Sequence, residues 1–276
     1  MQVDAPALAP MGPKHLDGAA ALSRAEDWPH RIEDWAFLLS GSQGVVALEE
    51  DQVVATTLVV PAGPVATAGM ILVDEQRRGR GLGRRVLERA MAQLSPAEWR
   101  LVATEDGLPL YRRLGFEVTG EVLQQQGLAQ AAPGGLPQIW AGEGDVRDLA
   151  ALDRAATGME RAWLLSALLR EGRVLINREA GQIEAFAALR PFGRGELVGP
   201  LVARSQEEAR ALLATLLSVC EGRFLRVDTP EGSGLGSFLA EHGLKTAGSG
   251  LAMSRGSMSL ALGPHRCFAL AAQALG

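Results

Sequence analysis

Cysteine, tyrosine and histidine are scarce in this chain of 276 residues, which contains two, one and four of them respectively. The two cysteines, Cys220 and Cys267, lie far apart and lack the spacing of metal ligands. So few cysteines cannot build a disulfide scaffold, and they are typical of a reducing compartment. The histidines are scattered and form no HExxH motif, so we expect no bound metal.

Long apolar runs and an excess of basic residues are also missing. No apolar run approaches the roughly 18 residues that a membrane-spanning helix needs. The 27 basic and 32 acidic residues give a net charge of −5, which provides no positive field for nucleic acid or an anionic membrane. Residues 1–6 show neither the basic nor the apolar region of a signal peptide. We expect a cytoplasmic monomer or homodimer that binds neither nucleic acid nor membrane.

A glycine-rich loop between a strand and a helix is the most informative stretch of the sequence. Met70–Val73 is apolar and rich in branched side chains, as in a buried strand. Glycines then alternate with other residues over 79–83 among arginines, and apolar residues recur at helical spacing over 86–94. The backbone N–H groups of such a loop and the positive end of the helix dipole attract a negatively charged group. The stretch therefore predicts an anion site.

The spacing of the glycines excludes two common anion-binding loops. A dinucleotide fingerprint would need glycine at 84 or 86, where Arg84 and Val86 stand, and no Walker A motif is present. The pattern that remains is Arg78-x-x-Gly81-x-Gly83. The alternative is an ordinary strand–helix loop that happens to be basic and rich in glycine.

With this pattern the chain resembles the GNAT acyl-CoA N-acyltransferases, in which the loop binds the pyrophosphate of coenzyme A. The chain departs from the family at Glu75, where many GNAT proteins have proline. The resemblance implies acetyl-CoA as co-substrate and no metal. The residues expected to bind acetyl-CoA are Leu72, Val73, Arg78, Gly79, Arg80, Gly81, Leu82, Gly83 and Arg84.

A second segment strengthens the resemblance. A short strand at 101–104 is followed by a stretch that permits a helix and ends in Leu114-Gly115-Phe116, typical of a glycine stop and a return to the sheet. The segment matches a Tyr-x-x-x-Gly-Phe pattern of GNAT proteins, with Tyr111 at the tyrosine position. In the family this tyrosine protonates the departing thiolate, and a phenol with a pKa of about 10 is protonated at neutral pH. Otherwise Tyr111 would be a half-buried helix residue.

An unusual cluster of aromatic and charged residues spans 28–39. We expect Pro29 in the first turn of a helix, with Glu33 and Asp34 near its positive end. In GNAT proteins this region commonly shapes the acceptor site, so the resemblance implies that Trp28, His30, Glu33 and Asp34 bind a cationic amine. His30, Glu33 and Asp34 are also candidates for the catalytic base, and the pKa of histidine suits this role best. The alternative is a surface helix whose charges are solvated.

The composition changes between about 124 and 144, where glutamine, proline and glycine predominate, as in a linker. The second half then repeats the first: Leu225–Thr229 and Phe238–Leu244 match segments around Leu101 and Tyr111. Arg204–Glu208 stands where the glycine-rich loop would be, and Leu239 replaces the tyrosine. We therefore expect one acyl-CoA site, at residues 1–126, then a linker at 127–144 and a divergent GNAT-like domain at 145–276. This layout resembles the tandem, YitH-like type of GNAT protein.

The expected fold is α/β (α+β), with two GNAT-like domains, each a mixed, mostly antiparallel sheet with flanking helices. The expected function is acetyl-CoA-dependent N-acetyl transfer to a primary amine of a small molecule by direct attack. The alternative is a non-catalytic acyl-CoA-binding or regulatory module. Asp153, Arg161 and Trp163 could reach the acceptor site from the second half, although helix periodicity makes a core role more natural.

Overall fold

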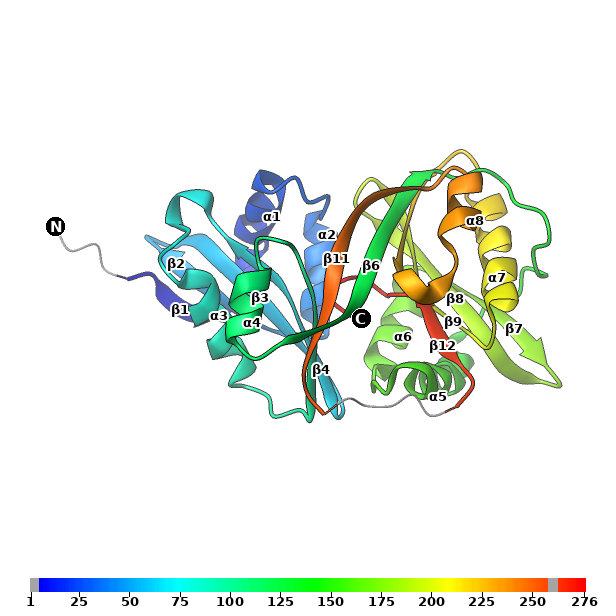
Figure 1. Cartoon of the computed structure of the whole chain (residues 1–276), viewed down its shortest axis with the longest axis horizontal. Helices are drawn as coiled ribbons and strands as arrows, with labels where there is room; N and C mark the ends of the chain where they lie inside the picture. Colours follow the sequence, from blue (N-terminus) through cyan, green and yellow to red (C-terminus); the bar gives the residue numbers. More distant parts are fainter. Residues whose placement is uncertain (1–4, 258–262) are drawn as a thin grey trace.

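The computed structural model describes residues 5–257 and 263–276, which form one continuous sheet with helices on both faces (Figure 1). The order of the strands across this sheet is β1-β2-β3-β4-β5-β11-β6-β10-β9-β8-β7, and β12 pairs with β9. We call β1 to β6 the first unit and α5 to β12 the second unit. The first unit contains β1 (Ala7–Pro10), α1 (Leu16–Ala25), α2 (Ile32–Ser40), β2 (Gln43–Glu49), β3 (Gln52–Ala62), β4 (Val65–Val73), α3 (Leu82–Met91), β5 (Glu98–Ala103), α4 (Leu108–Arg113) and β6 (Glu117–Leu128). The second contains α5 (Val146–Thr157), α6 (Ala162–Glu171), β7 (Arg173–Glu179), β8 (Gln182–Phe192), β9 (Gly195–Ala203), α7 (Gln206–Val219), β10 (Phe224–Pro230), α8 (Gly236–Glu241), β11 (Lys245–Gly256) and β12 (Arg266–Ala269).

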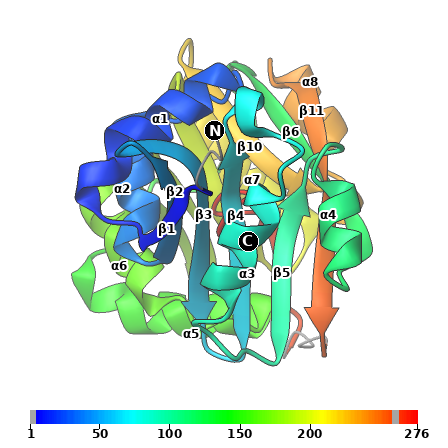
Figure 2. The ribbon, with the colours of Figure 1, turned by 90° about the vertical axis from the view of Figure 1, so that its left-hand side faces the viewer.

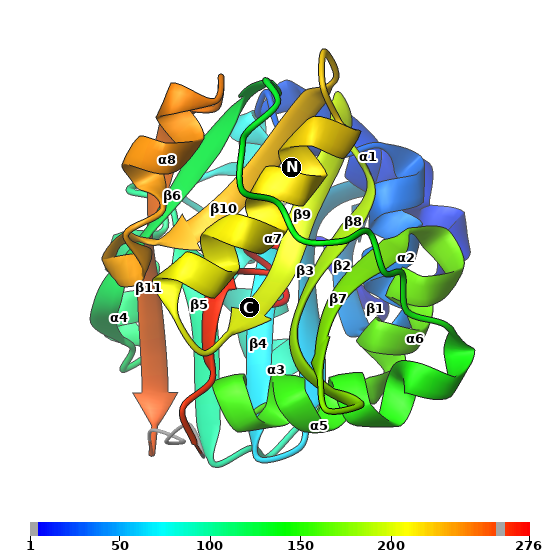
Figure 3. The ribbon, with the colours of Figure 1, turned by 90° about the vertical axis from the view of Figure 1, so that its right-hand side faces the viewer.

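The second unit repeats the first element by element. Two helices, three antiparallel strands, a helix, a strand, a short helix and a long strand follow one another in each (Figures 2 and 3). The mixed, largely antiparallel sheet with flanking helices confirms the predicted fold class, and the repeated order of elements confirms the predicted repeat.

The two units exchange their long last strands. β11 of the second unit pairs with β5 of the first unit over Leu251–Gly256. β6 of the first unit pairs with β10 of the second over 122–128, and β6 and β11 are antiparallel neighbours at the centre. β6 therefore contains residues 124–126, where the change in composition begins, and also 127 and 128, the first residues of the expected linker. The polar side chains of residues 124–126 misled the prediction, because a sheet between two units accepts glutamines that pair with neighbouring strands, as Gln125 and Thr229 do.

The helices cover the sheet according to their apolar faces. In α3, Val86, Leu87 and Ala90 are fully buried and recur at helical spacing, packing against β2, β3 and β4. The apolar faces of α1, α2, α5 and α6 share one large core across both units. The two units are therefore joined by a common core as well as by exchanged strands.

The helix predicted to start at Pro29 begins later. Arg31 is the residue before the helix, and its backbone N–H donates to the Asp34 carboxylate at 2.9 Å. Asp34 thereby caps the helix that starts at Ile32, and Pro29 stays in the preceding loop.

The C-terminal segment fills an opening in the sheet of the second unit. β9 and β10 pair in parallel only over 196–198 and 225–227. Beyond these residues β12 pairs with β9, and the backbone N–H of Leu270 donates to the carbonyl oxygen of Asp228 at 2.8 Å. A Cβ added to Gly199 would lie 1.8 Å from the Leu270 carbonyl oxygen, so the segment is in close contact with β9. The chain thus occupies the gap between its own strands in the second unit.

A buried ion pair anchors the end of this segment. The Arg161 guanidinium and the Asp153 carboxylate are at most 1% exposed and lie 2.7 Å apart. Arg161 also donates to the carbonyl oxygens of Leu275 and Gly276. We had considered that Asp153 and Arg161 reach toward the acceptor site. In the structure they hold the C-terminal segment instead. Trp163, the third, packs against Phe37 with ring centroids 6.5 Å apart.

We predict that Arg161→Met destabilises the protein by about 3–5 kcal/mol, because it leaves the Asp153 charge buried and unpaired. The matched control is Arg154→Met, since the Arg154 side chain is 56% exposed in its pair with Glu160. This control should cost less than about 1 kcal/mol. Urea unfolding of both variants measures the difference, and equal losses would contradict the anchoring role.

Candidate active site

The parallel strands β4 and β5 separate beside the glycine-rich loop. They pair only over Val65–Thr67 and Glu98–Arg100, although each strand continues beyond. A bulge in the β3–β4 pairing accompanies the separation, and Met70 has a φ of 53°, a strained conformation for a residue other than glycine.

A cavity of about 270 Å³, which we call the splay cavity, lies where the strands separate. Both units line it. The first unit contributes Trp28, His30, Gly69, Met70, Val102 and Thr104, and the second contributes Phe192, Arg226, Asp228 and Gln273. The cavity is therefore an interface site.

The glycine-rich loop presents its backbone to solvent at the start of α3. Gly79 and Gly81 have φ values of 75° and 74°, the left-handed region that glycine adopts without strain. A Cβ built on either glycine meets no atom within 4 Å, so the space above the loop is open. Gly83 differs, since a Cβ there would lie 3.3 Å from the Val73 side chain, which reflects close packing of α3 on β4.

The N–H groups of this loop and of the first turn of α3 suit an oxygen-rich anion. Within the described residues, the backbone hydrogen bonds between elements include none donated by residues 79–84. The first turn of a helix leaves its N–H groups without intrahelical acceptors. Residues 79–84 can therefore bind a diphosphate in the way expected at a helix N-terminus.

The loop arginines are only partly available to such an anion. Arg78 pairs with Glu26, and Arg84 pairs with Glu88 at 2.7 Å across one helical turn. Arg80 is exposed. Arg78 also donates to the Val73 carbonyl oxygen at 3.3 Å, which ties the loop to the end of β4. An arriving anion would compete with exposed ion pairs, which are individually weak.

Leu72 and Val73 face opposite sides of the sheet. The Leu72 side chain is 4% exposed in the core shared with α1 and α2, while Val73 packs against the core under α3. These two residues can offer a ligand their backbone rather than their side chains, because β5 no longer pairs with this part of β4.

Tyr111 lies on α4, immediately after β5. Its ring is buried and makes an edge contact with Phe116, with ring centroids 6.3 Å apart. A Cβ added to Gly107 would lie 3.2 Å from the tyrosine hydroxyl oxygen, and Gly107 itself donates its N–H to the carbonyl oxygen of Thr104. The hydroxyl is thus close to the loop after β5, whose Thr104 lines the splay cavity. Burial raises the pKa of Tyr111 to about 12, so the hydroxyl stays protonated at neutral pH.

The structure separates the four residues expected at the acceptor site. Trp28 and His30 line the splay cavity, with ring centroids 5.7 Å apart. Glu33 is exposed on α2 and does not line this cavity. Asp34 is buried beneath it and accepts hydrogen bonds from Arg31 and from the backbone N–H of Gly193. These bonds favour the ionised form and lower the pKa of Asp34 although burial opposes them, which argues against Asp34 as a base.

His30 is held neutral. Burial, together with the positive charges of Arg226 and Arg190, lowers its pKa to about 4, while Asp34 acts in the opposite direction. Its Nδ1 atom is enclosed and has no hydrogen-bond partner among the described residues. A neutral imidazole with a free nitrogen can accept a proton, although the nearby arginines weaken it as a base.

We predict that His30 makes stability depend on pH. Its pKa is lower in the folded state than the ordinary value of 6.5, so the unfolded chain binds a proton first as the pH falls. The wild type should therefore lose up to about 3 kcal/mol between pH 6.5 and pH 4 that His30→Gln does not lose. Denaturant unfolding at several pH values compares the two proteins. Parallel curves would show that the histidine is not buried in its neutral form.

Sequence reasoning missed the residues that the second unit contributes. Arg226 and Asp228 on β10 are 7% and 1% exposed, and two guanidinium nitrogens of Arg226 bond the carboxylate. An Arg-x-Asp pair within an apolar strand was the available signal, because charges are rarely buried unless they are paired. The second unit has no counterpart of the glycine-rich loop: Ser205 caps α7, whose first turn contains Glu207 and Glu208.

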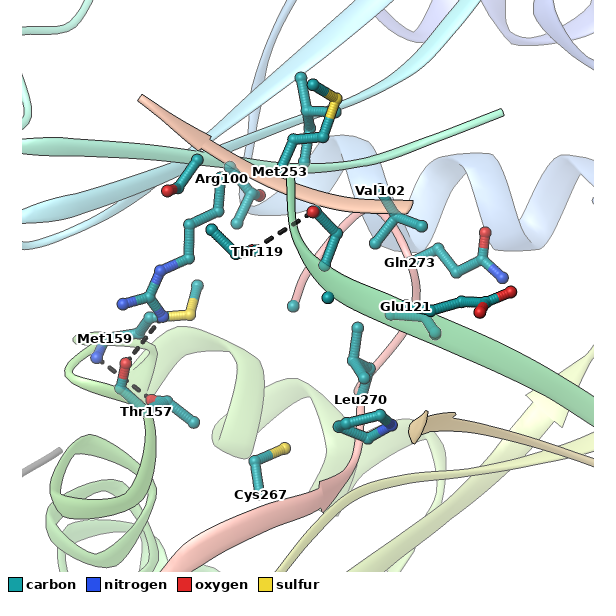
Figure 4. A pocket seen from close by; sticks show the side chains of 18 of the residues that line it. Arg100, Val102, Thr119, Glu121, Thr157, Met159, Met253, Cys267, Leu270 and Gln273 are labelled. Carbon is teal, nitrogen blue, oxygen red and sulfur yellow. Dashed lines mark hydrogen bonds between the residues drawn. The ribbon is translucent and has the colours of Figure 1, made fainter. Parts of the chain in front are cut away.

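A larger cavity of about 390 Å³ adjoins the splay cavity between the units. Both cavities share Val102 and Gln273, which lie with Glu121 at one end of the larger cavity (Figure 4). Arg100 lies at the other end and donates to the carbonyl oxygen of Thr157 at 2.8 Å. Gln273, on the C-terminal segment, therefore stands between the two spaces.

Two classes of site are not seen in the described part of the chain. Residues 5–257 and 263–276 contain no group of three or more histidine, cysteine or acidic residues placed to hold a metal ion. Nor does any helix in these ranges have the length and apolar character needed to cross a membrane.

Comparisons with known proteins identify the family. Two family models, both described as acetyltransferase (GNAT) domains, match residues 40–118 and 149–269. The chain is 26% identical over 231 residues to an uncharacterized N-acetyltransferase, YitH, of Bacillus subtilis, a match that covers 79% of each protein.

Solved structures show the same fold. A candidate acetyltransferase from Pyrococcus horikoshii superposes with a TM-score of 0.80 at 19% identity, covering 100% of this chain and 98% of the other. A tandem GNAT protein from the clavulanic acid biosynthesis pathway gives 0.61 at 16% identity, covering 92% and 99%. The chain is therefore an acyltransferase that belongs to the GNAT acetyltransferases, of the tandem type with a divergent second GNAT domain.

Proposed function

We propose that the protein transfers an acetyl group from acetyl-CoA to a primary amine of a small molecule by direct attack. The observation that carries this proposal is the separation of β4 and β5 after three paired residues, with the splay cavity between them and the open loop at the start of α3. One active site, in the first unit, follows because the C-terminal segment fills the matching gap in the second unit.

Each part of this site has a role in the proposed reaction. Bound acetyl-CoA supplies a thioester that an uncharged amine can attack. Backbone N–H groups of residues 79–84 hold the diphosphate, and the free edge of β4 near Leu72 and Val73 aligns the thioester arm. A backbone N–H between Met70 and Val73 stabilises the oxyanion, so that positioning and electrostatic stabilisation provide most of the rate enhancement.

Two side chains move protons in this scheme. His30 accepts a proton from the incoming ammonium, directly or through water, and Tyr111 donates one to the departing thiolate. The protonated form of Tyr111 at neutral pH supports its role as donor. His30 is assigned as the acceptor on position, because it lines the splay cavity whereas Glu33 and Asp34 do not. Trp28 contributes an aromatic wall to the cavity.

The proposal extends to the organisation of the protein and its location. We retain residues 1–126 as the catalytic domain and 145–276 as the divergent domain, with 127–144 between them, of which 127 and 128 complete β6. Both cysteines are free thiols in the structure, and Cys220 is buried, which supports a cytoplasmic location. We propose a monomer or homodimer.

Calorimetric titration with acetyl-CoA and a thiol-release assay test this function. The acceptor panel consists of polyamines, amino acids, aminoglycosides and peptide N-termini. We expect acetyl-CoA to bind and at least one acceptor to release thiol. Failure of acetyl-CoA to bind would overturn the proposal, and binding without thiol release across the panel would favour a non-catalytic acyl-CoA-binding module.

A further inference from the structure

The second unit places a rigid guanidinium in the wall of the splay cavity. Arg226 donates from Nε to both carboxylate oxygens of Asp228, at 3.0 and 3.2 Å, and from Nη2 at 2.9 Å. Its guanidinium also lies 5.3 Å from the ring centre of Phe192. Its hydrogen bonds within the described residues use Nε and Nη2 but not Nη1. Arg226 is therefore fixed in place with one nitrogen left for a ligand.

Behind this wall of the cavity, the positive charge of Arg190 is only partly balanced by the carboxylate of Asp34. Asp34 is a buried carboxylate that does not line the cavity, and it already accepts hydrogen bonds from Arg31 and the Gly193 N–H. Arg190 is 2% exposed and reaches Asp34 only at 3.5 Å, while its Nε and Nη2 atoms lack partners in the described structure. Arg190 and Arg226 both disfavour a proton on His30.

The remaining charged groups at the cavity do not cancel the positive charge of its enclosed wall. Asp228, on the same strand as Arg226, is already paired with it. Asp27 lines the cavity from the loop after α1 but is exposed, so solvent screens its charge. Arg194 is exposed in the turn between β8 and β9 and lines a smaller adjoining cavity of about 80 Å³, not the splay cavity. The enclosed part of the wall is thus suited to an anion.

We propose that the acceptor is an amino-carboxylate, whose carboxylate binds Arg226 of the second unit and whose amine faces Met70 of the first. This inference rests on the proposed function and specifies its acceptor. Both residues line one cavity of about 270 Å³, which is the size of a small-molecule site. The planar guanidinium suits a carboxylate better than a lysine ammonium would. The divergent unit thereby has a role in acceptor binding although it lacks the cofactor loop.

Matched pairs of acceptors test the proposal on the full-length protein. Each pair consists of an amino acid and the amine that remains when its carboxylate is removed: lysine and cadaverine, ornithine and putrescine, phenylalanine and phenethylamine, and β-alanine and ethylamine. We expect kcat/KM in the thiol-release assay to be at least tenfold higher for the amino acid of any pair that reacts. Arg226→Gln should abolish this preference, since a hydrogen bond to a charged group contributes about 1.5–3 kcal/mol. Equal or faster turnover of the decarboxylated amines would overturn it.

A binding experiment makes the test independent of turnover. The N-acetyl derivatives of the four amino acids and of their decarboxylated partners are titrated into the protein, with and without coenzyme A. We expect a carboxylate-bearing derivative to bind at least tenfold more tightly than its partner, and Arg226→Gln to remove the difference. If no carboxylate binds while acetyl-CoA does, the carboxylate site is wrong and the proposed function stands. If acetyl-CoA itself fails to bind, the proposed function fails, and these titrations still decide the carboxylate site.

Two further variants separate direct contact from charge and from folding. Arg194→Gln removes the same charge from the smaller adjoining cavity, and we expect it to leave the preference for carboxylates intact. Arg226→Gln combined with Asp228→Asn avoids a buried unpaired carboxylate, so it should fold if the single variant does not. Retention of the preference in this double variant would overturn the assignment of Arg226.

Discussion

Gly81→Asp should weaken acetyl-CoA binding by at least a hundredfold. Gly81 precedes α3 with a φ of 74°, and no atom lies within 4 Å of a Cβ built there, so a new side chain would extend into the space proposed for the diphosphate. A carboxylate about 5 Å from one phosphate charge costs about 3 kcal/mol at an effective dielectric constant of about 20. Calorimetric titration with acetyl-CoA measures this loss directly.

Gly81→Asn is the matched control, because asparagine has nearly the same shape as aspartate but no charge. Asparagine also tolerates the left-handed conformation better than most residues, so the backbone cost should be about 1–2 kcal/mol in both variants. We expect the asparagine variant to bind acetyl-CoA at least tenfold more tightly than the aspartate variant. Normal binding by both variants would show that the loop does not hold the diphosphate.

The places of the glycine-rich loop and of Tyr111 in the fold could be predicted from the sequence because their signals are local. Gly79 and Gly81 need positive φ values, and a stretch of a few residues determines both the turn and the start of α3. Tyr111 likewise sits at a fixed distance before Gly115, whose φ of 82° ends α4. Neither feature depends on distant parts of the chain.

The splay cavity could not be predicted in the same way, because half of its wall comes from the second unit. Strand exchange brings β10 next to β6, and the C-terminal segment then crosses to the first unit, where Thr67 donates to the carbonyl oxygen of Ala274 at 2.8 Å. Arg226 is nearly 200 residues from His30 in sequence, and no periodicity connects them.

Asp34 illustrates a different limit of sequence reasoning. A carboxylate beside tryptophan and histidine suggested a base, but its position three residues after Arg31 also suits a helix cap. The structure shows the cap and adds the Gly193 N–H of the second unit as a donor. Asp34 therefore connects the two units, a role that depends on a contact across 159 residues.

Tyr111→Phe should lower kcat at least tenfold and leave the affinity for acetyl-CoA nearly unchanged. The substitution removes only the hydroxyl, and proton transfer by a positioned side chain typically contributes a factor of about 100 to 10,000. With a pKa of about 12, the wild-type hydroxyl should remain protonated up to about pH 11, so its own ionisation should not limit activity at pH 7–10. Steady-state kinetics with any acceptor found in the panel, together with acetyl-CoA titration, measures both effects.

Phe116→Leu distinguishes catalysis from packing, because Phe116 contacts the Tyr111 ring within the same buried cluster but has no hydroxyl. We expect this variant to lose stability while keeping kcat within a few-fold of the wild type. Tyr111→Phe should instead keep its stability and lose kcat. An unchanged kcat in Tyr111→Phe would remove the general-acid role. Within the described residues the Tyr111 hydroxyl makes no hydrogen bond, and it is not among the enclosed polar atoms that lack a partner. The hydroxyl is therefore free to donate to a departing thiolate, as the proposed reaction requires.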